Sequence, residues 1–221
     1  MIEAIIFDFD GVVLDSEPLH YEACCQVLKP LNLTLSYKEY QEQYLGLADK
    51  EMFPKLMQRM NYPISKDEIK LLAHKKSKVY IDIITQAQTL PVIEGFQNFL
   101  MSIATKVKKL AICSGSTRNE IESALTKIAE GKLSTYFDTI VTTENVSQGK
   151  PSPEGYLLTA ERINIKPEHC LVIEDTPHGI QAAKEAGMRV IGLLTSYKHT
   201  KLLKADKTIS NFKQLLLEDV L

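Results

Sequence analysis

Short apolar runs recur along the 221-residue chain and alternate with longer amphipathic segments. Runs that are apolar throughout, without a polar residue at every second position, are typical of strands buried on both faces of a parallel sheet. We therefore predict strands at Ala4–Phe9, Leu110–Ser114, Thr139–Thr142, Cys170–Ile173 and Arg189–Leu194.

The segments between the later strands have helical periodicity. They predict helices at Ile121–Ile128, Pro153–Ile163 and Ile180–Ala186. Strands that alternate with helices indicate βαβ units, in which the helices cover both faces of the sheet. The predicted fold class is therefore α/β, with a doubly wound and mainly parallel sheet.

The region after the first strand has no convincing strand pattern. We predict that residues 16–91 form an inserted α-helical domain, and that residues 1–15 and 92–221 form the α/β core. The chain leaves and re-enters the core at two neighbouring connections, which could act as a hinge. The helices predicted within the insert are Pro18–Leu28, Tyr37–Tyr44, Lys50–Met60 and Ser65–Gln86.

Composition excludes several classes of partner. The chain has 26 basic and 28 acidic residues, so it lacks the basic field that attracts nucleic acid or an anionic membrane. No two of its four cysteines have C-x-x-C spacing, and Cys113 and Cys170 lie in predicted strands, which favours a reducing compartment. The first residues carry no signal-peptide pattern. We therefore expect a cytoplasmic protein with no nucleic-acid or membrane partner.

Two carboxylates, Asp8 and Asp10, lie at i and i+2 at the end of the first predicted strand. Ligands of open α/β sheets bind at that edge. Pleat alternation predicts both side chains on the same side, and Gly11 allows the backbone to turn closely around a bound group. An acidic turn without a function is an equally good interpretation of this pair alone.

A serine-containing segment follows the second predicted strand. Ser114, Gly115 and Ser116 precede a helix in which Thr117 and Glu120 have the spacing of a capping box. The Ser114 hydroxyl and the amides at the start of the helix could bind a phosphate group. An ordinary capped helix is the alternative for this segment in isolation.

A lysine and a second acidic pair lie further along the chain. Lys150 precedes Pro151 and Pro153, which fix the backbone, so its ammonium group could neutralise both a phosphate and a carboxylate. Glu174 and Asp175 follow the fourth predicted strand, where stabilisation of the next helix dipole is the alternative role. Acids at two strand ends indicate a hard cation such as Mg²⁺, and the scattered histidines disfavour zinc.

In order and spacing, four motifs together resemble the haloacid dehalogenase superfamily of phosphotransferases: D-F-D-G-V at 8–12, S-G-S at 114–116, K-P-S-P at 150–153 and E-D at 174–175. The helical insert and the G-I-Q-A-A-K-E-A-G-M run at 179–188 are similar to the β-phosphoglucomutase-like subfamily, which includes many sugar-phosphate phosphatases. The resemblance implies a Rossmann-like core with a helical cap. It also implies a Mg²⁺-dependent phosphatase that acts on a small phosphorylated metabolite, with sugar phosphates as the leading candidates.

The resemblance further implies a role for each motif residue. Asp8 would attack phosphorus, and Asp10 would protonate the leaving oxygen and later deprotonate the attacking water. An aspartate in the position of Asp10 argues against dehalogenation. The residues implied to bind the phosphoryl oxygens are Ser114, Gly115 and Lys150. Those implied to bind Mg²⁺ are Asp8, Asp10 through its carbonyl, Asp175, and Glu174 either directly or through another ligand.

The insert would be a cap that closes over the site and reads the rest of the substrate. The candidate substrate residues are His20, Lys50 and Lys76 in the insert and Arg118 in the core. The ordinary interpretation of each is a solvated charge on a helix surface. A cap that must open and close leads us to expect a monomer.

A sugar-phosphate phosphomutase of the β-phosphoglucomutase type is the alternative activity. Asp49 falls where the mutase has a phosphate-binding arginine in its cap, and Thr117-Arg118 replaces a lysine and an asparagine, which favours hydrolysis. A signalling receiver module shares the clustered acids but would be one compact domain without an insert. Nucleotide and phosphoglycolate substrates remain open.

Overall fold

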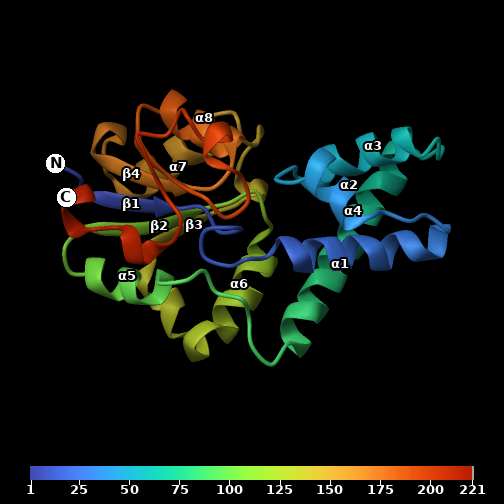
Figure 1. The fold of residues 1–221 in the computed structure, drawn as a ribbon, viewed down its shortest axis with the longest axis horizontal. Coiled ribbons are helices and arrows are strands. Elements are labelled where there is room, and N and C mark those ends of the chain that lie inside the picture. Colours follow the sequence, from blue (N-terminus) through green and yellow to red (C-terminus); the bar gives the residue numbers. More distant parts are fainter. Residues whose placement is uncertain (221) are drawn as a thin grey trace. The chain divides into compact units, whose positions relative to one another are not determined.

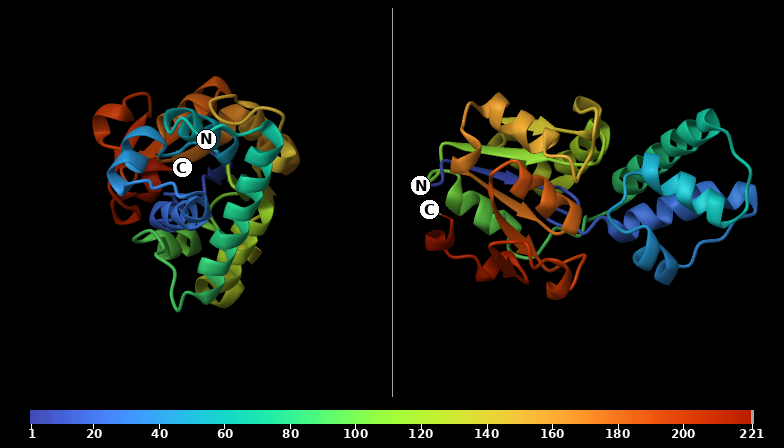
Figure 2. Two further views of the ribbon diagram at one scale, coloured as in Figure 1. Left: turned by 90° about the vertical axis from the view of Figure 1, so that its right-hand side faces the viewer. Right: turned by 90° about the horizontal axis from the view of Figure 1, so that it is seen from above.

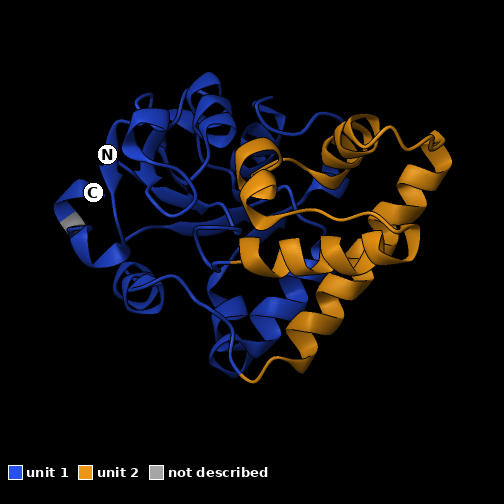
Figure 3. Ribbon diagram, turned by 45° about the vertical axis from the view of Figure 1, so that its right-hand side comes forward, with its two compact units in different colours: residues 1–15, 89–221 blue, residues 16–88 orange. Residues whose placement is uncertain are grey.

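The structure, a computed structural model, describes residues 1–220 and divides into two compact units (Figure 3). The first unit comprises Met1–Asp15 and the chain from Thr89 onward. The second unit is the inserted segment Ser16–Gln88. Each unit has its own apolar core.

The first unit is built on a six-stranded parallel sheet with the strand order β3-β2-β1-β4-β5-β6. This confirms the predicted doubly wound α/β fold. The sixth strand was not predicted, because a three-residue segment with the sequence Lys-Thr-Ile carries little apolar signal. The strands are β1 (Ala4–Phe7), β2 (Lys109–Cys113), β3 (Thr139–Val141), β4 (Cys170–Glu174), β5 (Arg189–Leu193) and β6 (Lys207–Ile209).

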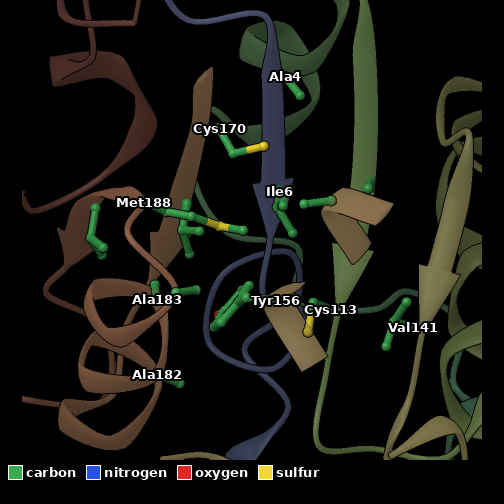
Figure 4. Packing of buried hydrophobic residues seen from close by; sticks show 14 of the residues in the cluster. Ala4, Ile6, Cys113, Val141, Tyr156, Cys170, Ala182, Ala183 and Met188 are labelled. Carbon is green, nitrogen blue, oxygen red and sulfur yellow. The ribbon is translucent and has the colours of Figure 1, made fainter. Parts of the chain in front are cut away.

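Helices cover both faces of the sheet, with α7 and α8 on one face and α5 and α6 on the other (Figures 1 and 2). Alternation along β1 explains the two layers. Ile6 joins the cluster formed with α7 and α8 (Figure 4), whereas the ring of Phe7 packs edge-on against Phe96 and Phe99 of α5. The helices are α5 (Phe96–Ile103), α6 (Arg118–Lys127), α7 (Glu154–Ile163) and α8 (Pro177–Glu185). Short 3-10 turns lie at Lys29–Leu31, Ile128–Tyr136, Thr143–Asn145, Pro167–His169, His199–Lys201, Phe212–Gln214 and Leu217–Asp219.

The first strand is shorter than predicted. It ends at Phe7, so pleat alternation within a strand does not place Asp10. A tight turn does so instead, in which the amide of Val13 donates to the carbonyl of Phe9 and the amide of Gly11 to that of Leu14. Gly11 has φ of +74°, a conformation that residues with a Cβ atom rarely adopt.

The inserted unit consists of four helices, which are α1 (Glu17–Leu28), α2 (Tyr37–Gln43), α3 (Asp49–Arg59) and α4 (Lys66–Gln86). Its core is apolar and includes Leu28, Phe53 and Leu56, all of which are fully buried. Ser65 and Glu68 form a capping box that begins α4, in agreement with a helix from about Ser65. All four helices were predicted, with ends that differ by one residue.

The chain leaves and re-enters the first unit at adjacent points. The amide of Asp15 donates to the carbonyl of Pro91 at 2.8 Å, and Leu14 forms an isolated antiparallel bridge with Val92. All four cysteines are free. Across residues 1–220, no helix combines the length and apolar composition needed to cross a bilayer.

Candidate active site

The polar residues of the sequence motifs gather at the carboxyl end of the sheet. Asp8 directly follows β1, Ser114 follows β2, and Glu174 and Asp175 lie at the end of β4. Strands β1 and β4 are neighbours at the point where the strand order changes direction, which is where open α/β sheets bind their ligands. Lys150 reaches the same place from the segment before α7, because its ammonium group contacts Asp8.

Lys150 links two of these carboxylates. Its Nζ atom donates to Asp8 Oδ1 at 2.6 Å, to Glu174 Oε1 at 2.7 Å and to the carbonyl oxygen of Cys113 at 3.2 Å. An ammonium group has three protons, so these three acceptors account for all of them. The position of the positive charge is therefore fixed beside Asp8.

The pKa values of Asp8 and Lys150 both depart from their ordinary values. It raises the pKa of the Asp8 carboxyl to about 8; Lys150 opposes this effect, and the neighbouring charges of Glu174 and Asp10 add to it. Burial alone would lower the pKa of Lys150, but the carboxylates of Asp8 and Glu174 outweigh it and raise that pKa well above its ordinary value. The one positive charge of Lys150 thus does not offset the effect of burial and of the neighbouring carboxylates on the pKa of Asp8.

Two serine hydroxyls hold the Asp10 carboxylate. Ser116 Oγ donates to Asp10 Oδ2 at 2.6 Å, and Ser114 Oγ lies 3.4 Å from the same oxygen. The amide of Ser116 donates in turn to Ser114 Oγ at 3.0 Å, which couples the two serines. Asp10 is therefore oriented by the loop after β2, although its own position in the chain follows β1.

Asp175 lies against the turn that contains Gly11. A Cβ atom added at Gly11 would fall 1.9 Å from Asp175 Oδ2, so only glycine leaves room for this carboxylate. Thr195, which follows β5, donates to the carbonyl of Gly11 at 2.5 Å and lies 3.5 Å from Asp175 Oδ2. Asp175 therefore lies with Asp8 at the carboxyl end of the sheet.

The carboxylates of this site fit a hard divalent cation. Ligand oxygens of Asp8, Glu174 and Asp175 all lie within 4.8 Å of one another, and all three residues are buried. When all three are ionised beside one ammonium group, uncompensated negative charge remains, which is unfavourable in the interior of a protein. A set made only of oxygen donors suits Mg²⁺ and disfavours softer metals.

The start of α6 does not provide all the phosphate donors expected from the sequence. The predicted capping box is confirmed, and it uses the amide of Thr117, which donates to Glu120. The amide of Arg118 donates to Glu144 and that of Ser116 to Ser114. These donors are engaged within the protein, whereas Gly115 is exposed beside them.

The four candidate substrate residues have different surroundings. Arg118 donates to the carbonyl of Ile140 at 2.7 Å and pairs with Glu122 at 3.2 Å, which gives it structural partners within the core. Lys50 is exposed on α3. His20 and Lys76 are both buried, so the interpretation of Lys76 as a solvated surface charge is wrong.

Within the inserted unit, Lys76 belongs to a polar cluster. Its Nζ atom lies 3.0 Å from Asp49 Oδ1 and 2.9 Å from His20 Nδ1. The ring of His20 stacks on that of Tyr80 with a centroid separation of 4.0 Å. Helical periodicity marks Lys76 as an inward position, because it lies four residues from both Leu72 and Tyr80, which are also buried.

Three residues of the site were not identified from the sequence. Ser116 belongs to the S-G-S motif at 114–116, but the sequence indicated no role for it. Thr195 directly follows a predicted strand, so its place at the active edge of the sheet could have been inferred. Tyr156 contacts Glu174 through its hydroxyl at 3.2 Å, and no local pattern distinguishes it from an ordinary core residue of α7.

Known proteins resemble this chain over nearly its full length. Residues 5–193 match the haloacid dehalogenase-like hydrolase family. A phosphorylated carbohydrates phosphatase of Thermotoga maritima is 33% identical over 204 residues, which cover 91% of this chain and 90% of the relative.

Two solved structures have closely similar folds. A β-phosphoglucomutase of Clostridium difficile is 27% identical with a TM-score of 0.86, covering 99% of this chain and 95% of that one. CbbY of Rhodobacter sphaeroides, solved with xylulose 1,5-bisphosphate, has a TM-score of 0.90 at 23% identity and covers 100% and 99% of the two chains. The second likeness concerns the fold alone.

Proposed function

The chain belongs to the haloacid dehalogenase-like hydrolases, and from this premise we propose that it is a Mg²⁺-dependent phosphatase of sugar phosphates that works through an aspartyl-phosphate on Asp8. The observation that carries the proposal is the contact of Lys150 with Asp8 at 2.6 Å, beside an Asp10 carboxylate held by Ser116. A fixed carboxylate, a fixed ammonium group and a second carboxyl group are the elements that phosphoryl transfer through an enzyme carboxylate requires.

In the first step, a carboxylate oxygen of Asp8 attacks phosphorus. The bond between phosphorus and the ester oxygen breaks, and the protonated carboxyl of Asp10 gives its proton to the leaving alkoxide. Proton donation matters because a sugar alkoxide is a poor leaving group. Lys150 and the Ser114 hydroxyl stabilise the charge on the phosphoryl oxygens.

In the second step, the Asp10 carboxylate accepts a proton from a water molecule that attacks the phosphorus of the aspartyl-phosphate. The bond between phosphorus and the Asp8 oxygen breaks, which releases inorganic phosphate and regenerates the Asp8 carboxylate. Asp10 thus returns to its protonated form, and the cycle balances in protons.

Asp8 and Asp175 would bind Mg²⁺, together with the main-chain carbonyl of Asp10 that the family resemblance implies. When bound, the cation supplies positive charge to the transferring phosphoryl group and neutralises the surplus of buried carboxylates. It would also lower the pKa of Asp8 from its raised value, because an adjacent positive charge favours the ionised form.

A sugar phosphate is the proposed substrate class, supported by the relative from Thermotoga maritima, whose name specifies phosphorylated carbohydrates. The inserted unit, residues 16–91 in the sequence-based division, would act as the cap that selects among them. The mutase alternative rests on the similarity to β-phosphoglucomutase. Asp49 argues against it, because this acidic residue pairs with Lys76 where the mutase has an arginine.

Release of inorganic phosphate from a panel of sugar phosphates, with Mg²⁺ and with chelator, tests the proposal. We expect Mg²⁺-dependent release, with loss of release in Asp8→Asn while the fold survives. Faster interconversion of a hexose 1-phosphate and 6-phosphate than release of phosphate would instead establish the mutase activity. Unchanged turnover in Asp8→Asn would exclude the covalent mechanism.

A further inference from the structure

The Glu174 carboxylate is surrounded by hydrogen-bond donors from the protein. Its Oε2 atom accepts from the amides of Asp175 and Thr176, both at 2.8 Å, and from the Thr176 hydroxyl at 3.0 Å. Its Oε1 atom accepts from Lys150 at 2.7 Å and from the Tyr156 hydroxyl at 3.2 Å. A carboxylate offers about four lone-pair positions, so five donors use its capacity. Little remains for direct coordination of a cation.

The space around Glu174 is equally restricted. Its side chain is fully buried, and a Cβ atom added at Gly179 would lie 1.6 Å from Oε1 and 2.5 Å from Oε2. The carboxylate therefore fills a space against α8 that only a glycine leaves available. Turning toward a cation would break its contacts with Lys150 and with the start of α8.

Tyr156 contacts both members of the Glu174–Lys150 pair. Its hydroxyl donates to Glu174, and the Lys150 Nζ atom lies 5.1 Å from the centre of its ring, within the range of a cation–π interaction. The residue is fully buried in the cluster between the sheet and α7 (Figure 4). A tyrosine rather than a phenylalanine at this point adds one hydrogen bond to the carboxylate that orients the lysine.

We propose that Glu174 and Tyr156 are positioning residues that hold Lys150 on Asp8, and that Glu174 does not coordinate the cation. The inference rests on the proposed phosphatase function, because it assigns a task within that site. Tyr156 and the start of α8 hold Glu174, Glu174 holds Lys150, and Lys150 holds the carboxylate that attacks phosphorus. Glu174 thus acts through the lysine and leaves coordination to Asp8 and Asp175.

Three variants of the full chain separate this role from coordination. Tyr156→Phe removes only the hydroxyl, Glu174→Gln keeps the shape but removes the charge, and Asp175→Asn alters a proposed ligand as the matched control. Circular dichroism melting establishes that each variant is folded. Mg²⁺ affinity is measured by calorimetry, because the chain has no tryptophan to report binding by fluorescence.

Loss of a ligand should weaken Mg²⁺ binding by about 10-fold or more in Asp175→Asn, and Glu174→Gln should stay within about threefold of wild type. We expect kcat to fall by about 10-fold in Glu174→Gln and by less in Tyr156→Phe, with the half-saturating Mg²⁺ concentration unchanged, because a charge-assisted contact to Lys150 is weakened. Equal weakening of Mg²⁺ binding in Glu174→Gln and Asp175→Asn would overturn the inference.

The reactivity of Lys150 provides a readout that needs neither metal nor turnover. Labelling of its amine by an acylating reagent, followed by mass spectrometry in chelator, should be slow in wild type and Asp175→Asn. It should be several-fold faster in Glu174→Gln and Tyr156→Phe, and unchanged labelling in both would overturn the positioning role. Should wild type release no phosphate from any ester, the proposed function fails, and the labelling result still decides where Lys150 is held.

Discussion

Gly179 and Glu174 approach each other so closely that a Cβ atom at position 179 would lie 1.6 Å from the carboxylate. The amide of Gly179 also donates to Thr176 Oγ1, the N-cap of α8, so the helix cannot easily shift away. The first turn of α8 and the acidic end of β4 are thus fitted to each other. This contact determines where Glu174, and through it Lys150, can lie.

The first prediction concerns this fit. Gly179→Ala should displace Glu174 and reduce the free energy of unfolding by about 2 kcal/mol, as overpacking of a buried site does. Urea denaturation of the single and double variants measures this loss of unfolding free energy. On a Glu174→Ala background the same substitution should have little further effect, because the clashing carboxylate is absent. Additive losses would show that the strain arises elsewhere.

The second prediction follows from the pKa of Asp8, which burial raises from 3.8 to about 8. Because the folded-state pKa is the higher one, the stability linked to the protonated carboxyl is present below about pH 4 and is lost as the pH rises through about 8. In chelator, Asp8→Asn should therefore melt at a higher temperature than wild type near pH 8. The difference should narrow as the pH falls toward 5.

Added Mg²⁺ provides the control for that experiment. It should stabilise wild type more than Asp8→Asn, since the ionised carboxylate is the proposed ligand. Calorimetric Mg²⁺ affinity of wild type should also increase with pH up to about 8, because the proton competes with the cation. A difference in melting temperature between wild type and Asp8→Asn that stays the same at every pH would contradict the raised pKa of Asp8.

The third prediction concerns the contact between Ser116 and Asp10. Ser116→Ala should lower kcat for a sugar phosphate by about 10-fold with little change in KM, because Asp10 loses the hydroxyl that orients it for proton transfer. First-turnover release of p-nitrophenol from p-nitrophenyl phosphate should change less, since that leaving group needs no proton. Equal losses with both substrates would indicate that Ser116 acts on phosphate binding.

The fourth prediction concerns Lys76 in the inserted unit. Asp49→Ala removes a carboxylate that pairs with the buried ammonium group and should reduce the free energy of unfolding by about 1–3 kcal/mol. Lys76→Met should reduce it less, because Asp49 is partly exposed and can be solvated. Thermal or urea denaturation of both variants gives the comparison.

The Lys76→Met variant also decides whether Lys76 contributes to substrate binding. A substrate role predicts a KM for sugar phosphates raised by about 10-fold or more, with a smaller change for p-nitrophenyl phosphate. A purely structural role predicts the same small change for both esters. Lys55→Met, at an exposed position of α3 and not among the candidate substrate residues, is the matched control and should leave both KM values near those of wild type.

Features that depend on local pattern could be predicted from the amino-acid sequence. Apolar runs predicted five of the six strands, and the capping-box spacing of Thr117 and Glu120 predicted the start of a helix, because these signals lie within a few residues of one another. The order and spacing of the motifs also predicted the family, and the match over residues 5–193 confirms it. The roles of Asp8, Lys150 and Asp175 remain predictions.

The partner of each functional group could not be predicted in this way, because it depends on how distant parts of the chain fold together. Lys150 and Asp8 are separated by 142 positions in the chain, and Ser116 and Asp10 by 106, so no local rule relates them. Two of the five donors around Glu174, Lys150 and Tyr156, likewise come from other elements, and so do Asp49 and His20, the partners of Lys76. The physical reason is that residue types limit the chemistry a site can perform, whereas burial and hydrogen-bond geometry assign each group its task.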